Sequence, residues 1–581
     1  MFKVLHSSAG AGKTHALVKH YLGHCLAKSD HGAYRHVLAL TFTNKAAAEM
    51  KERVIGYLEG LAKGGPYQGP LADVAEHLQQ LGGIDHNELA QRAHVVLGHM
   101  LHHWGDVAIS TIDAFTRRVV KPFARDLRMD QELRMTTEQE FYREEAVNAV
   151  IDRAGTDPRT TELLTLTCLQ LLHEERSWEP TKPLLDLSRE LLNERSIAPL
   201  LRLRGRSTED LARLMEQLNV ETARFRSQVR TLGKEAASLF TDQGLGPADI
   251  AHSGAILKYF IKLSSFSDHW DPPGAHTLSP IEKGKLNAGK ASASAISALE
   301  TIADRVTMLF LEAERLREDG FPQYVIQRAV ARELLPTFAL HEIDGTLEEL
   351  KRADGVAFFS DLTRRVSEVV KDEPVPFIYE RLGERYRHFL IDEFQDTSLL
   401  QWNALLPLID HALSTDGSVL LVGDAKQAIY RWRNGEVRLF VELPKLFGLD
   451  HSDAALVQRE ETLHRTFQRG EPLVHNRRSA QRIIAFNNAL FDALPEVLAP
   501  SFRKVYHEQR QASWRSDMGV VRITKDEAGL RGKDLGDAIA AHALNSVRSA
   551  IAAGFAAGDV AVLVRSKRVG RAVAEHLLAH G

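Results

Sequence analysis

The feature that most constrains this chain is a short glycine-rich loop close to its start. Residues 7–14 read Ser-Ser-Ala-Gly-Ala-Gly-Lys-Thr, after an apolar run at 2–5 and before a helical stretch from about 14 to 27. A strand, a loop of small residues and a helix in this order bring backbone N–H groups and the positive end of a helix dipole to one point. The loop matches the pattern G-x-x-x-x-G-K-[ST], except that Ser7 replaces the first glycine. It predicts an α/β domain that binds a phosphate group at this loop.

The last two residues of the loop have separate expected tasks. The Lys13 ammonium is expected to reach the β- and γ-phosphates of a nucleotide, and the Thr14 hydroxyl is expected to hold Mg²⁺. The alternative is a chance Gly-Lys-Thr turn, which the surrounding strand and helix disfavour. The residues predicted to bind ATP are Ser7, Ser8, Ala9, Gly10, Ala11, Gly12, Lys13 and Thr14.

Apolar runs alternating with helical stretches predict a parallel sheet. Strands are expected at 36–43, 107–112, 388–392 and 418–423, with a helix at 44–62. Between them, residues from about 131 to 380 have helical spacing, for example at 183–196, 208–240 and 291–319, with a long loop expected at 264–290. A helical block is therefore expected inside an α/β domain. A further α/β region is expected from about 470 to 581, with strands at 519–523 and 559–564.

Two carboxylates follow the buried strand that ends at Ile391. In an open parallel sheet, ligands bind beyond the carboxyl ends of the strands. Asp392 is therefore expected to bind Mg²⁺ through a water, and Glu393 to act as the general base for the water that attacks the γ-phosphate. The same residues also suit an acidic helix N-cap. The glycine-rich loop favours the ATPase interpretation.

A third strand, at 418–423, ends in a polar turn. Gln427 in this turn is expected to contact the γ-phosphate or the attacking water. Tyr430 and Trp432 alternate with Arg431 and Arg433, which is the combination of stacking and charge that holds single-stranded nucleic acid. The alternative is a surface turn followed by an aromatic core anchor.

Composition excludes several other classes of protein. Lys and Arg number 73 against 77 Asp and Glu, so the chain of 581 residues is not a globally basic nucleic-acid binder. Two cysteines, Cys25 and Cys168, are too few for a disulfide framework and favour a reducing compartment. The apolar run at 2–5 is too short for a signal peptide, and the sequence lacks an apolar run of 18 residues. A cytoplasmic location without membrane contact is expected.

Taken in order, six segments resemble the motifs of the UvrD/Rep-type superfamily 1 DNA helicases, and within them the RecB/AddA-like branch. Two of them are highly specific: Thr-Phe-Thr-Asn-Lys-Ala-Ala at 41–47 and Asp-Glu-Phe-Gln-Asp at 392–396. In the sixth segment, at 476–479, Arg477 stands where the family has Tyr. The other segments are 8–14, Ser-Thr-Ile-Asp-Ala-Phe at 110–115, and 422–433.

This resemblance implies an α/β fold with a P-loop NTPase (RecA-like) parallel sheet domain, a large all-helical insertion and a partial second RecA-like domain. It implies a first motor domain at 1–115 and 385–445, an accessory insertion at 116–384, and an incomplete second motor domain at 446–581. It further implies 3′–5′ movement on single-stranded DNA driven by ATP and Mg²⁺, in DNA repair and recombination. The implied partners are single-stranded DNA, duplex junctions and a partner subunit of a helicase–nuclease complex.

The resemblance also assigns residues to the DNA and to the second motor domain. Arg478 is implied to touch the γ-phosphate from that second domain. The implied DNA contacts are Phe42, Asn44, Thr111, Asp113, Tyr430, Trp432 and Arg433.

Three departures from the family pattern shape the expected activity. The family's upstream glutamine, which reads adenine, has no counterpart before residue 7, and residues 433–436 read Arg-Asn-Gly-Glu in place of Arg-Gly-Ala-Asp. The family's last two motifs, with a second arginine finger, are also absent, so the chain is expected to be the N-terminal part of a longer enzyme. One arginine finger is worth about 10³–10⁵ in rate. We therefore expect nucleotide and DNA binding with weak hydrolysis. The alternative function is a nucleotide-gated DNA-binding subunit or scaffold.

Overall fold

A computed structural model describes most of the chain as two compact units. The described residues are 1–120, 134–173, 177–203, 208–358, 360–362, 364–365, 385–449, 451–506, 510–525 and 529–580. The first unit comprises Met1–His475 and Pro495–Gln509, and the second comprises Asn476–Leu494 and Arg510–Gly581.

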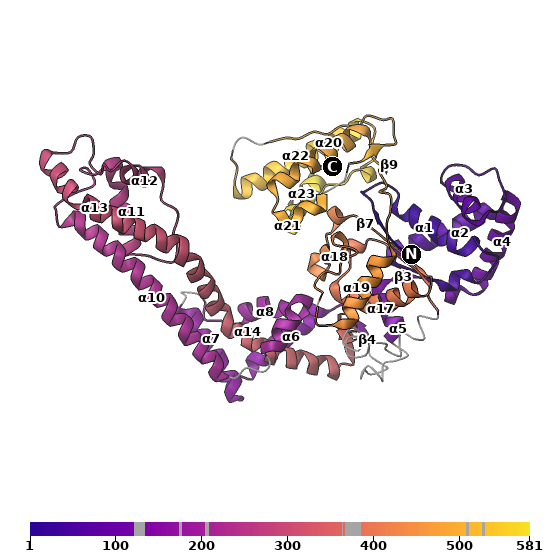
Figure 1. Ribbon diagram of the computed structural model, residues 1–581, viewed down its shortest axis with the longest axis horizontal. Helices are drawn as coiled ribbons and strands as arrows, with labels where there is room; N and C mark the ends of the chain where they lie inside the picture. Colours follow the sequence, from indigo (N-terminus) through magenta and orange to yellow (C-terminus); the bar gives the residue numbers. More distant parts are fainter. Residues whose placement is uncertain are drawn as a thin grey trace. The chain divides into compact units, whose positions relative to one another are not determined.

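The first unit is built on a six-stranded sheet (Figure 1). Its strands follow the order β3-β2-β6-β7-β1-β8, and every neighbouring pair is parallel. The predicted parallel sheet is thus confirmed, and it joins residues near both ends of the unit. The strands are β1 (Phe2–His6), β2 (Val37–Thr41), β3 (Ala108–Thr111), β6 (His388–Ile391), β7 (Ser418–Gly423) and β8 (Phe467–Arg469).

Both faces of this sheet are covered by helices. Side chains alternate along each strand, so that Phe389 and Ile391 enter one apolar core while Leu390 enters the other. This explains why the strands read as continuous apolar runs. One core receives α1 (Lys13–Leu26), α2 (Asn44–Ala62), α3 (Pro70–Gly82) and α4 (His86–His102), and the other receives α5 (Ile112–Val120), α17 (Leu399–Ser414), α18 (Arg438–Val441) and α19 (Ala454–Thr466).

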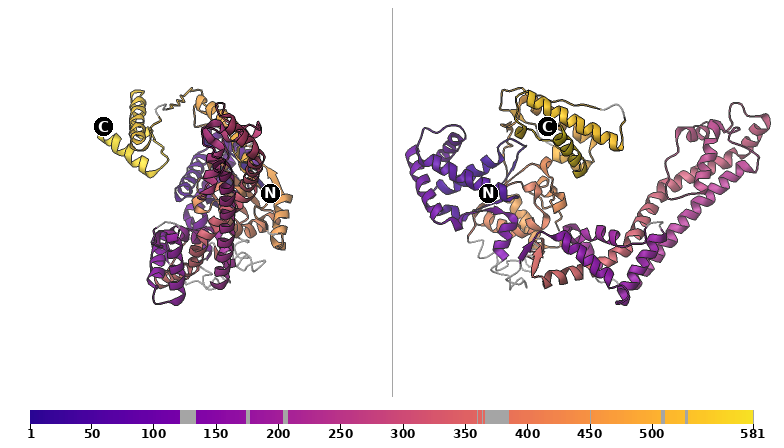
Figure 2. Two further views of the ribbon diagram at one scale, coloured as in Figure 1. Left: turned by 90° about the vertical axis from the view of Figure 1, so that its left-hand side faces the viewer. Right: turned by 180° about the vertical axis from the view of Figure 1, so that it is seen from behind.

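The chain between α5 and β6 is mostly helical, but it is not all-helical as the resemblance implies, because two of its segments pair as strands. Its longest helices, α10 and α14, run side by side in the views of Figures 1 and 2 and pack together. A short parallel ladder joins β4 (Arg134–Thr136) to β5 (Val356–Phe358). The helices are α6 (Gln139–Asp152), α7 (Pro158–His173), α8 (Thr181–Ser188), α9 (Ile197–Leu203), α10 (Thr208–Thr241), α11 (Ala251–Ser264), α12 (Ala275–Glu282), α13 (Ala293–Arg315) and α14 (Phe321–Ala353).

Two local predictions within the insertion were wrong. The segment 264–290, expected to be a loop, contains α12, because Thr277 and Pro280 are buried and Leu278 and Ile281 pack on the neighbouring core. Tertiary packing here overrides the low helix propensity of a sequence rich in Pro, Gly and Ser. The helix expected at 183–196 ends at Ser188 and continues as two short 3₁₀ turns.

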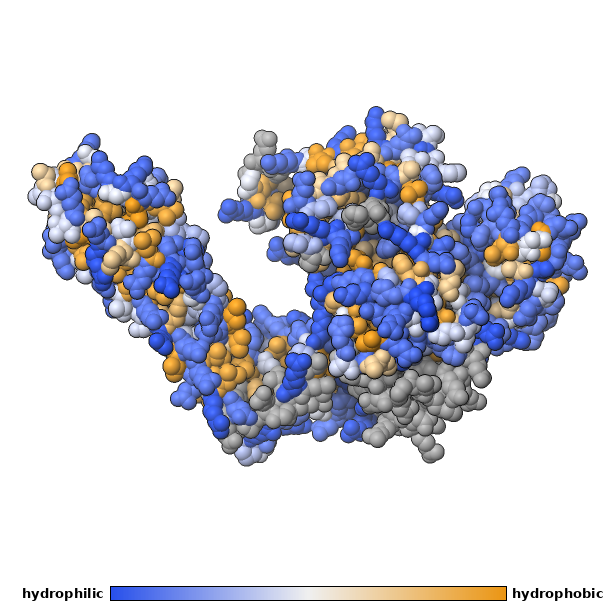
Figure 3. All heavy atoms as spheres, in the orientation of Figure 1, coloured by the Kyte–Doolittle hydropathy of each residue, from blue (hydrophilic) through white to orange (hydrophobic). Residues whose placement is uncertain are grey.

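The insertion also exposes apolar side chains. Figure 3 shows orange, hydrophobic atoms among blue ones along its helices. Leu166, Leu169 and Leu172 are exposed on α7, and Leu311 and Ile326 are exposed on α13 and α14. None of the helices in the described part of the chain combines the length and apolar character that a bilayer demands.

The second unit departs from the predicted α/β pattern. The expected strands at 519–523 and 559–564 are not strands, and Val520, Ile523 and Leu563 are exposed. A strand needs a hydrogen-bonded neighbour, and the described residues of this unit offer these segments none. The described elements that lie wholly or mainly in the unit are β9 (His475–Asn476), paired with β10 (Ala512–Ser513), α20 (Gln481–Val497), α22 (Gly532–Ala552) and α23 (Lys567–Ala579).

The boundary between the two units also differs from the expected start of a second domain at 446. Strand β8 pairs with β1 through Phe2 and Phe467, which places α19 and β8 in the first unit. Residues 495–509, with the short helix α21 (Pro500–Arg503), return to the first unit as well. The sixth strand was not predicted, because Phe-Gln-Arg has little apolar character.

A half-buried pair of histidines at the amino-terminal edge of the sheet predicts sensitivity to acid. His24 of α1 and His388 of β6 stack with ring centroids 3.9 Å apart, and both contact the Ser418 hydroxyl. Burial lowers the pKa of His24 to about 4 and that of His388 to about 3. The unfolded chain, with histidine pKa values near 6.5, therefore takes up protons first as the pH falls. Stability is full above about pH 6.5 and is lost as the pH drops toward 4.

Thermal unfolding at two pH values tests this expectation. Between about pH 7.5 and 5.5 we expect Tm to fall by several °C, and His24→Gln, whose amide does not titrate, should reduce that fall. His269→Gln is the matched control, because His269 is exposed and pairs only at the surface with Asp271. An equal fall in Tm for all three proteins would contradict the role of the histidine pair.

Candidate functional site

The glycine-rich loop lies directly beyond the carboxyl end of β1. The backbone N–H of Ser7 donates to the carbonyl of Gly423 at the end of β7, at 3.0 Å, so the loop starts directly beside the carboxyl end of β7. Gly10 and Gly12 have φ of 79° and 91°, a conformation that favours glycine. Gly12 is the N-cap of α1, and Lys13 is its first residue. Residues 7–14 thus form the turn between strand and helix that the sequence predicts.

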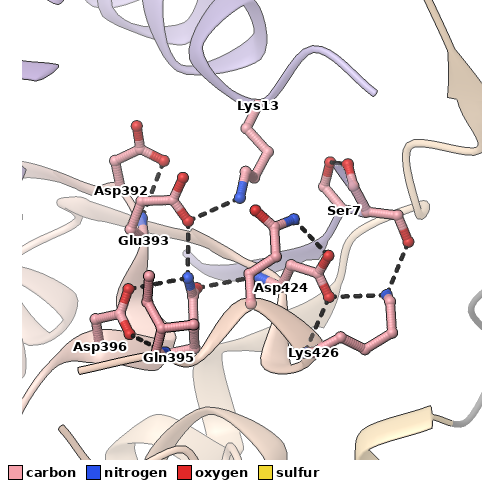
Figure 4. A network of polar contacts seen from close by, with 11 residues as sticks. Ser7, Lys13, Asp392, Glu393, Gln395, Asp396, Asp424 and Lys426 are labelled. Atoms are coloured by element: carbon pink, nitrogen blue, oxygen red, sulfur yellow. Dashed lines mark hydrogen bonds and ion pairs between the residues drawn. The ribbon is translucent and has the colours of Figure 1, made fainter. Parts of the chain in front are cut away.

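Glu393 and Lys13 bring two distant parts of the chain together. Lys13 Nζ donates to Glu393 Oε2 at 2.7 Å, across 380 residues of sequence, as Figure 4 shows. Glu393 directly follows Asp392 beyond β6 and has a φ of 49°, which is unusual for a residue with a side chain. Strained backbone of this kind concentrates at functional sites. The predicted phosphate-binding lysine and the predicted general base are therefore neighbours.

Asp392, next to Glu393, is buried. Its backbone N–H donates to the carbonyl of Leu40 in β2, and its side chain accepts from the N–H of Glu393. Burial, together with the neighbouring Glu393, raises the pKa of Asp392 to about 7. A buried carboxylate of this kind is stabilised by a nearby cation.

Beyond Glu393, a hydrogen-bond network continues along the edge of the sheet (Figure 4). Gln395 Nε2 donates to Glu393 at 2.8 Å, and Gln395 Oε1 accepts from the N–H of Asp424 at 3.0 Å. Asp424 in turn accepts from Lys426 at 2.8 Å and from Gln427 at 2.6 Å. Gln427 thus lies at the far end of a chain of contacts that leads back to Glu393.

Lys426 closes this network onto the glycine-rich loop. Its ammonium donates to Ser8 Oγ at 2.9 Å as well as to Asp424. Burial lowers the pKa of Lys426 from its usual range, while Asp424 opposes the change. The carboxyl ends of β1, β6 and β7 are therefore linked by one set of polar contacts. Asp396 joins them through Gln395, at 3.3 Å, and burial raises the pKa of Asp396 to about 6.

The close approach of Gln395 to the backbone predicts that Gly423 does not tolerate a side chain. A Cβ at Gly423 would lie 2.6 Å from Gln395 Oε1 and 3.2 Å from the Phe440 ring. Gly423→Ala should therefore displace Gln395 and destabilise the protein by about 1–3 kcal/mol. Urea unfolding measures the change. Gly98→Ala is the control, because a Cβ there meets nothing within 4 Å, in the middle of α4. Equal effects of the two substitutions would contradict the expectation.

The predicted DNA-binding aromatic residues form one cluster. The Phe42 ring, just beyond β2, lies 4.3 Å from the Tyr430 ring, and the Tyr430 and Trp432 rings are 6.1 Å apart. The Arg433 guanidinium lies 5.9 Å from the Phe42 ring and 5.3 Å from the Trp432 ring. Trp432 is 76% exposed, so it is not the core anchor of the alternative interpretation. A flat apolar face with an adjacent cation is thus available at the surface.

Three other residues that were predicted to contact DNA lie at the same edge of the sheet, and their surroundings differ. Asn44 is exposed at the first position of α2. Thr111 is nearly buried, and its hydroxyl accepts from the N–H of Ala114, which caps α5. Asp113 accepts from Gln401 Nε2 at 2.8 Å. Thr111 and Asp113 therefore have structural partners already, and their contact with DNA stays a prediction.

Arg478 belongs to the second unit and was predicted to act on the γ-phosphate. It is exposed, and its backbone N–H donates to Asn476 Oδ1 at 2.9 Å, as does that of Ser479. Asn476 is buried and also donates to Gln511. The Asn-Arg-Arg-Ser segment is therefore a tight turn organised by its asparagine. The predicted contact of Arg478 stays a prediction.

The residues that sequence reasoning missed are those that connect the predicted ones. Gln395, Asp424 and Lys426 stand inside recognised segments, but each also has a partner more than 25 residues away. Their position inside the polar segments that follow β6 and β7 was the available signal. Among the described residues, no group of three or more His, Cys, Asp or Glu side chains forms a metal centre.

Comparison with known proteins agrees with this geometry. Residues 3–448 match the model of the UvrD/REP helicase N-terminal domain, so the chain belongs to the UvrD/REP helicase family.

Individual relatives show which members of this family the chain is similar to. The chain is 24% identical, over 81% of its length, to an ATP-dependent helicase/nuclease subunit of Natranaerobius thermophilus. It is 25% identical over 88% of its length to the subunit of the same name from Geobacillus kaustophilus. It is 24% identical over 76% of its length to RecB of the Escherichia coli RecBCD enzyme. The chain spans 35% to 40% of the lengths of these relatives.

Proposed function

We propose that this chain is the ATP-driven motor part of a DNA helicase or translocase that acts in DNA repair and recombination. The observation that carries the proposal is the contact between Lys13 and Glu393, with the aromatic cluster of Trp432 at the same edge of the sheet. The family match and the names of the relatives support a DNA helicase. On this proposal, the six-stranded sheet of the first unit and the helices that cover it form a P-loop NTPase domain of the RecA-like type.

The contact of Lys13 with Glu393 suggests how the site is held before ATP binds. In the structure the two side chains neutralise each other. ATP phosphates attract the Lys13 ammonium, and the backbone N–H groups of residues 7–14 surround them. Glu393 then loses its cationic partner and accepts a proton from the attacking water. Gln395 keeps the Glu393 carboxylate in place during this exchange, since it donates to the same oxygen.

The residues present also fit Mg²⁺. Thr14 offers a hydroxyl and Asp392 a carboxylate, and oxygen ligands of this kind are those that Mg²⁺ prefers. The raised pKa of Asp392 agrees with a carboxylate built to be neutralised by a cation. When bound, Mg²⁺ neutralises charge that develops on the phosphates. Asp392 and Thr14 would orient it.

A chain of contacts leads from the nucleotide residues to the DNA residues. Gln395 donates to both Glu393 and Asp396. Asp396 Oδ1 accepts from the N–H of Ile429, which precedes Tyr430. A change in Glu393 on ATP binding therefore has a short path to the aromatic cluster. Bases of single-stranded DNA stack on Phe42, Tyr430 and Trp432, and Arg433 binds near their phosphates.

The remaining parts of the proposal rest on family resemblance. Movement in the 3′–5′ direction, contact of the insertion with duplex junctions, and a role for Arg478 at the γ-phosphate belong to this proposal. A cytoplasmic site of action belongs to it as well. So does assembly with a partner subunit, which the relatives' names as subunits of helicase–nuclease complexes support.

A second candidate is a nucleotide-gated DNA-binding subunit without efficient hydrolysis. It is favoured by the second unit, in which the only strands among the described residues are the two-residue strands β9 and β10. A motor of two lobes needs both of them to close on ATP. A clamp needs only the binding residues of the first unit.

A displacement experiment separates the two candidates. Streptavidin is bound to either end of a biotinylated single strand, and its release on adding ATP is followed. The motor proposal expects ATP-dependent release from the 5′ end, and the clamp expects none from either end despite tight DNA binding. Preferential release from the 3′ end would contradict the proposed direction. Failure to bind single-stranded DNA at all would contradict both candidates.

A further inference from the structure

The helical insertion contacts the loop that carries Trp432. Glu194 lies in a 3₁₀ turn of the insertion, and its backbone N–H donates to Asn434 Oδ1 at 3.2 Å. Asn434 Nδ2 donates back to the carbonyl of Leu192 at 3.1 Å. One side chain of the loop thus binds two backbone groups of the insertion, about 240 residues away in sequence.

Asn434 is held in a conformation that limits what else could stand there. Its φ is 66°, in the left-handed region that glycine and asparagine tolerate best. The carbonyl of Tyr430 accepts from the N–H groups of both Arg433 and Gly435, so the turn is tight. Its geometry suits glycine equally well, but only a side chain can reach the insertion.

A second contact lies two residues further along the loop. Glu436 is 5% exposed and forms an ion pair with Arg195 of the insertion. Arg438 binds the same carboxylate at 2.8 Å, so Glu436 is held between two guanidinium groups. Removing a partner from a buried carboxylate leaves charge uncompensated, which makes such a contact sensitive to substitution.

A third contact reaches the start of α17. The Glu194 carboxylate accepts from Ser398 Oγ at 2.7 Å and from the N–H of Leu400 at 3.1 Å. Ser398 is also bridged to Gly435, and Glu436 N–H donates to the carbonyl of Thr397. The insertion therefore contacts both the loop that carries Trp432 and the start of α17, and these two segments also contact each other.

We propose that the four residues Glu194, Arg195, Asn434 and Glu436, named here the clasp, let the insertion position the loop of Trp432 and Arg433 for single-stranded DNA. The inference rests on the proposed function for the DNA ligand, and on the structure for the contacts between the insertion and the loop. The clasp residues are positioning residues, because they act through Trp432. The insertion thus helps to set the affinity of the aromatic cluster from outside it.

Two substitutions, one on each side of the clasp, test the proposal in the full chain. Asn434→Gly removes both hydrogen bonds and keeps the backbone conformation, and Arg195→Ala removes the ion pair with Glu436. Arg189→Ala is the matched control, since Arg189 is an exposed arginine of the same insertion that pairs with Asp186. Affinity for a fluorescent oligo-dT is measured by anisotropy, and affinity for a fluorescent ATP analogue serves as the second readout.

We expect both clasp substitutions to weaken oligo-dT binding roughly three- to thirty-fold. Arg189→Ala should change it less than two-fold, and none of the three should alter affinity for the ATP analogue. In a Trp432→Ala background, Asn434→Gly should have a smaller effect, because one of the two side chains that the clasp positions is absent. Equal losses in the two backgrounds would overturn the proposal.

The salt dependence separates positioning from direct phosphate contact by Arg195. A lost phosphate contact lowers the slope of log affinity against log salt by about 0.7 for a single strand. The clasp predicts an unchanged slope for Arg195→Ala, and a reduced slope would overturn that part of it.

Hydrogen exchange distinguishes failure of this proposal from failure of the proposed function. Absence of oligo-dT binding by the wild-type chain would contradict the proposed function and remove the DNA role of the clasp with it. The contacts would then be judged by exchange alone. Faster exchange of amides 430–436 in both clasp variants, and not in Arg189→Ala, would support the clasp as a structural link. Unchanged exchange would overturn it.

Discussion

Glu393→Gln should abolish ATP turnover while leaving the nucleotide bound. The amide cannot accept the proton of the attacking water, and loss of a general base costs about 10²–10⁴ in rate. The amide still fits the space that the Glu393 side chain occupies and can still contact Gln395. Lys13 loses its ion-pair partner and is freer to bind phosphates, so affinity for ATP should stay equal or rise. Single-turnover hydrolysis and equilibrium binding of a fluorescent ATP analogue measure the two effects separately.

Asp410→Asn provides the matched control for Glu393→Gln. It also replaces a carboxylate by an amide, but on α17, away from the residues of the network at the edge of the sheet. Its turnover should lie within about two-fold of wild type. Turnover by Glu393→Gln at the wild-type rate would remove Glu393 from the catalytic role, even if its contact with Lys13 holds.

Trp432→Ala should weaken binding of single-stranded DNA by roughly ten- to one-hundred-fold. Stacking of one base on an aromatic side chain is worth about 1–3 kcal/mol. Because Trp432 is 76% exposed, the protein loses little packing, and its free energy of unfolding should change by less than about 0.5 kcal/mol. Fluorescence anisotropy with oligo-dT measures the binding, and urea unfolding measures the stability.

A second partly exposed tryptophan gives the control for Trp432→Ala. Trp104 lies in a 3₁₀ turn before β3, and therefore at the opposite edge of the sheet from Trp432. Trp104→Ala should leave oligo-dT affinity within about two-fold. If both substitutions weakened binding equally, the aromatic cluster would have no special role.

The sheet of the first unit was largely predictable from the sequence. Strands such as Phe389–Ile391 are covered on both faces, so they read as short apolar runs that few other structures allow. The glycine-rich loop fixed the start of α1 for the same kind of local reason. Strand β8 and helix α12 escaped prediction, because their existence depends on packing against distant segments.

In the candidate site as well, residues beside a local sequence signal were predictable and contacts between distant segments were less so. Lys13, Asp392, Glu393 and Gln427 were predictable because each stands next to a recognisable strand or helix signal. Their mutual contacts were predictable in outline, since the carboxyl ends of parallel strands share one edge. The clasp was not predictable. Asn434 and Leu192 are joined across 242 residues, and no periodicity or composition marks either of them.

In the second unit, the sequence predicted strands that the described residues do not form. Residues 519–523 and 559–564 have the apolar, β-branched character of strands, yet the described chain places them outside any ladder. A strand signal reports a side-chain preference and not the presence of a neighbour to pair with. The pattern was therefore correct about the residues and wrong about their structure.

On the proposed function, ATP hydrolysis at the Lys13–Glu393 site is coupled to DNA binding at the Trp432 cluster. The most direct test is the rate of ATP hydrolysis by the wild-type chain, measured with and without saturating oligo-dT. We predict that oligo-dT raises the weak turnover expected of this chain, and that Trp432→Ala shifts the stimulation to higher oligo-dT concentrations. Turnover that is measurable but identical with and without oligo-dT, in a chain that binds both ligands, would contradict this coupling.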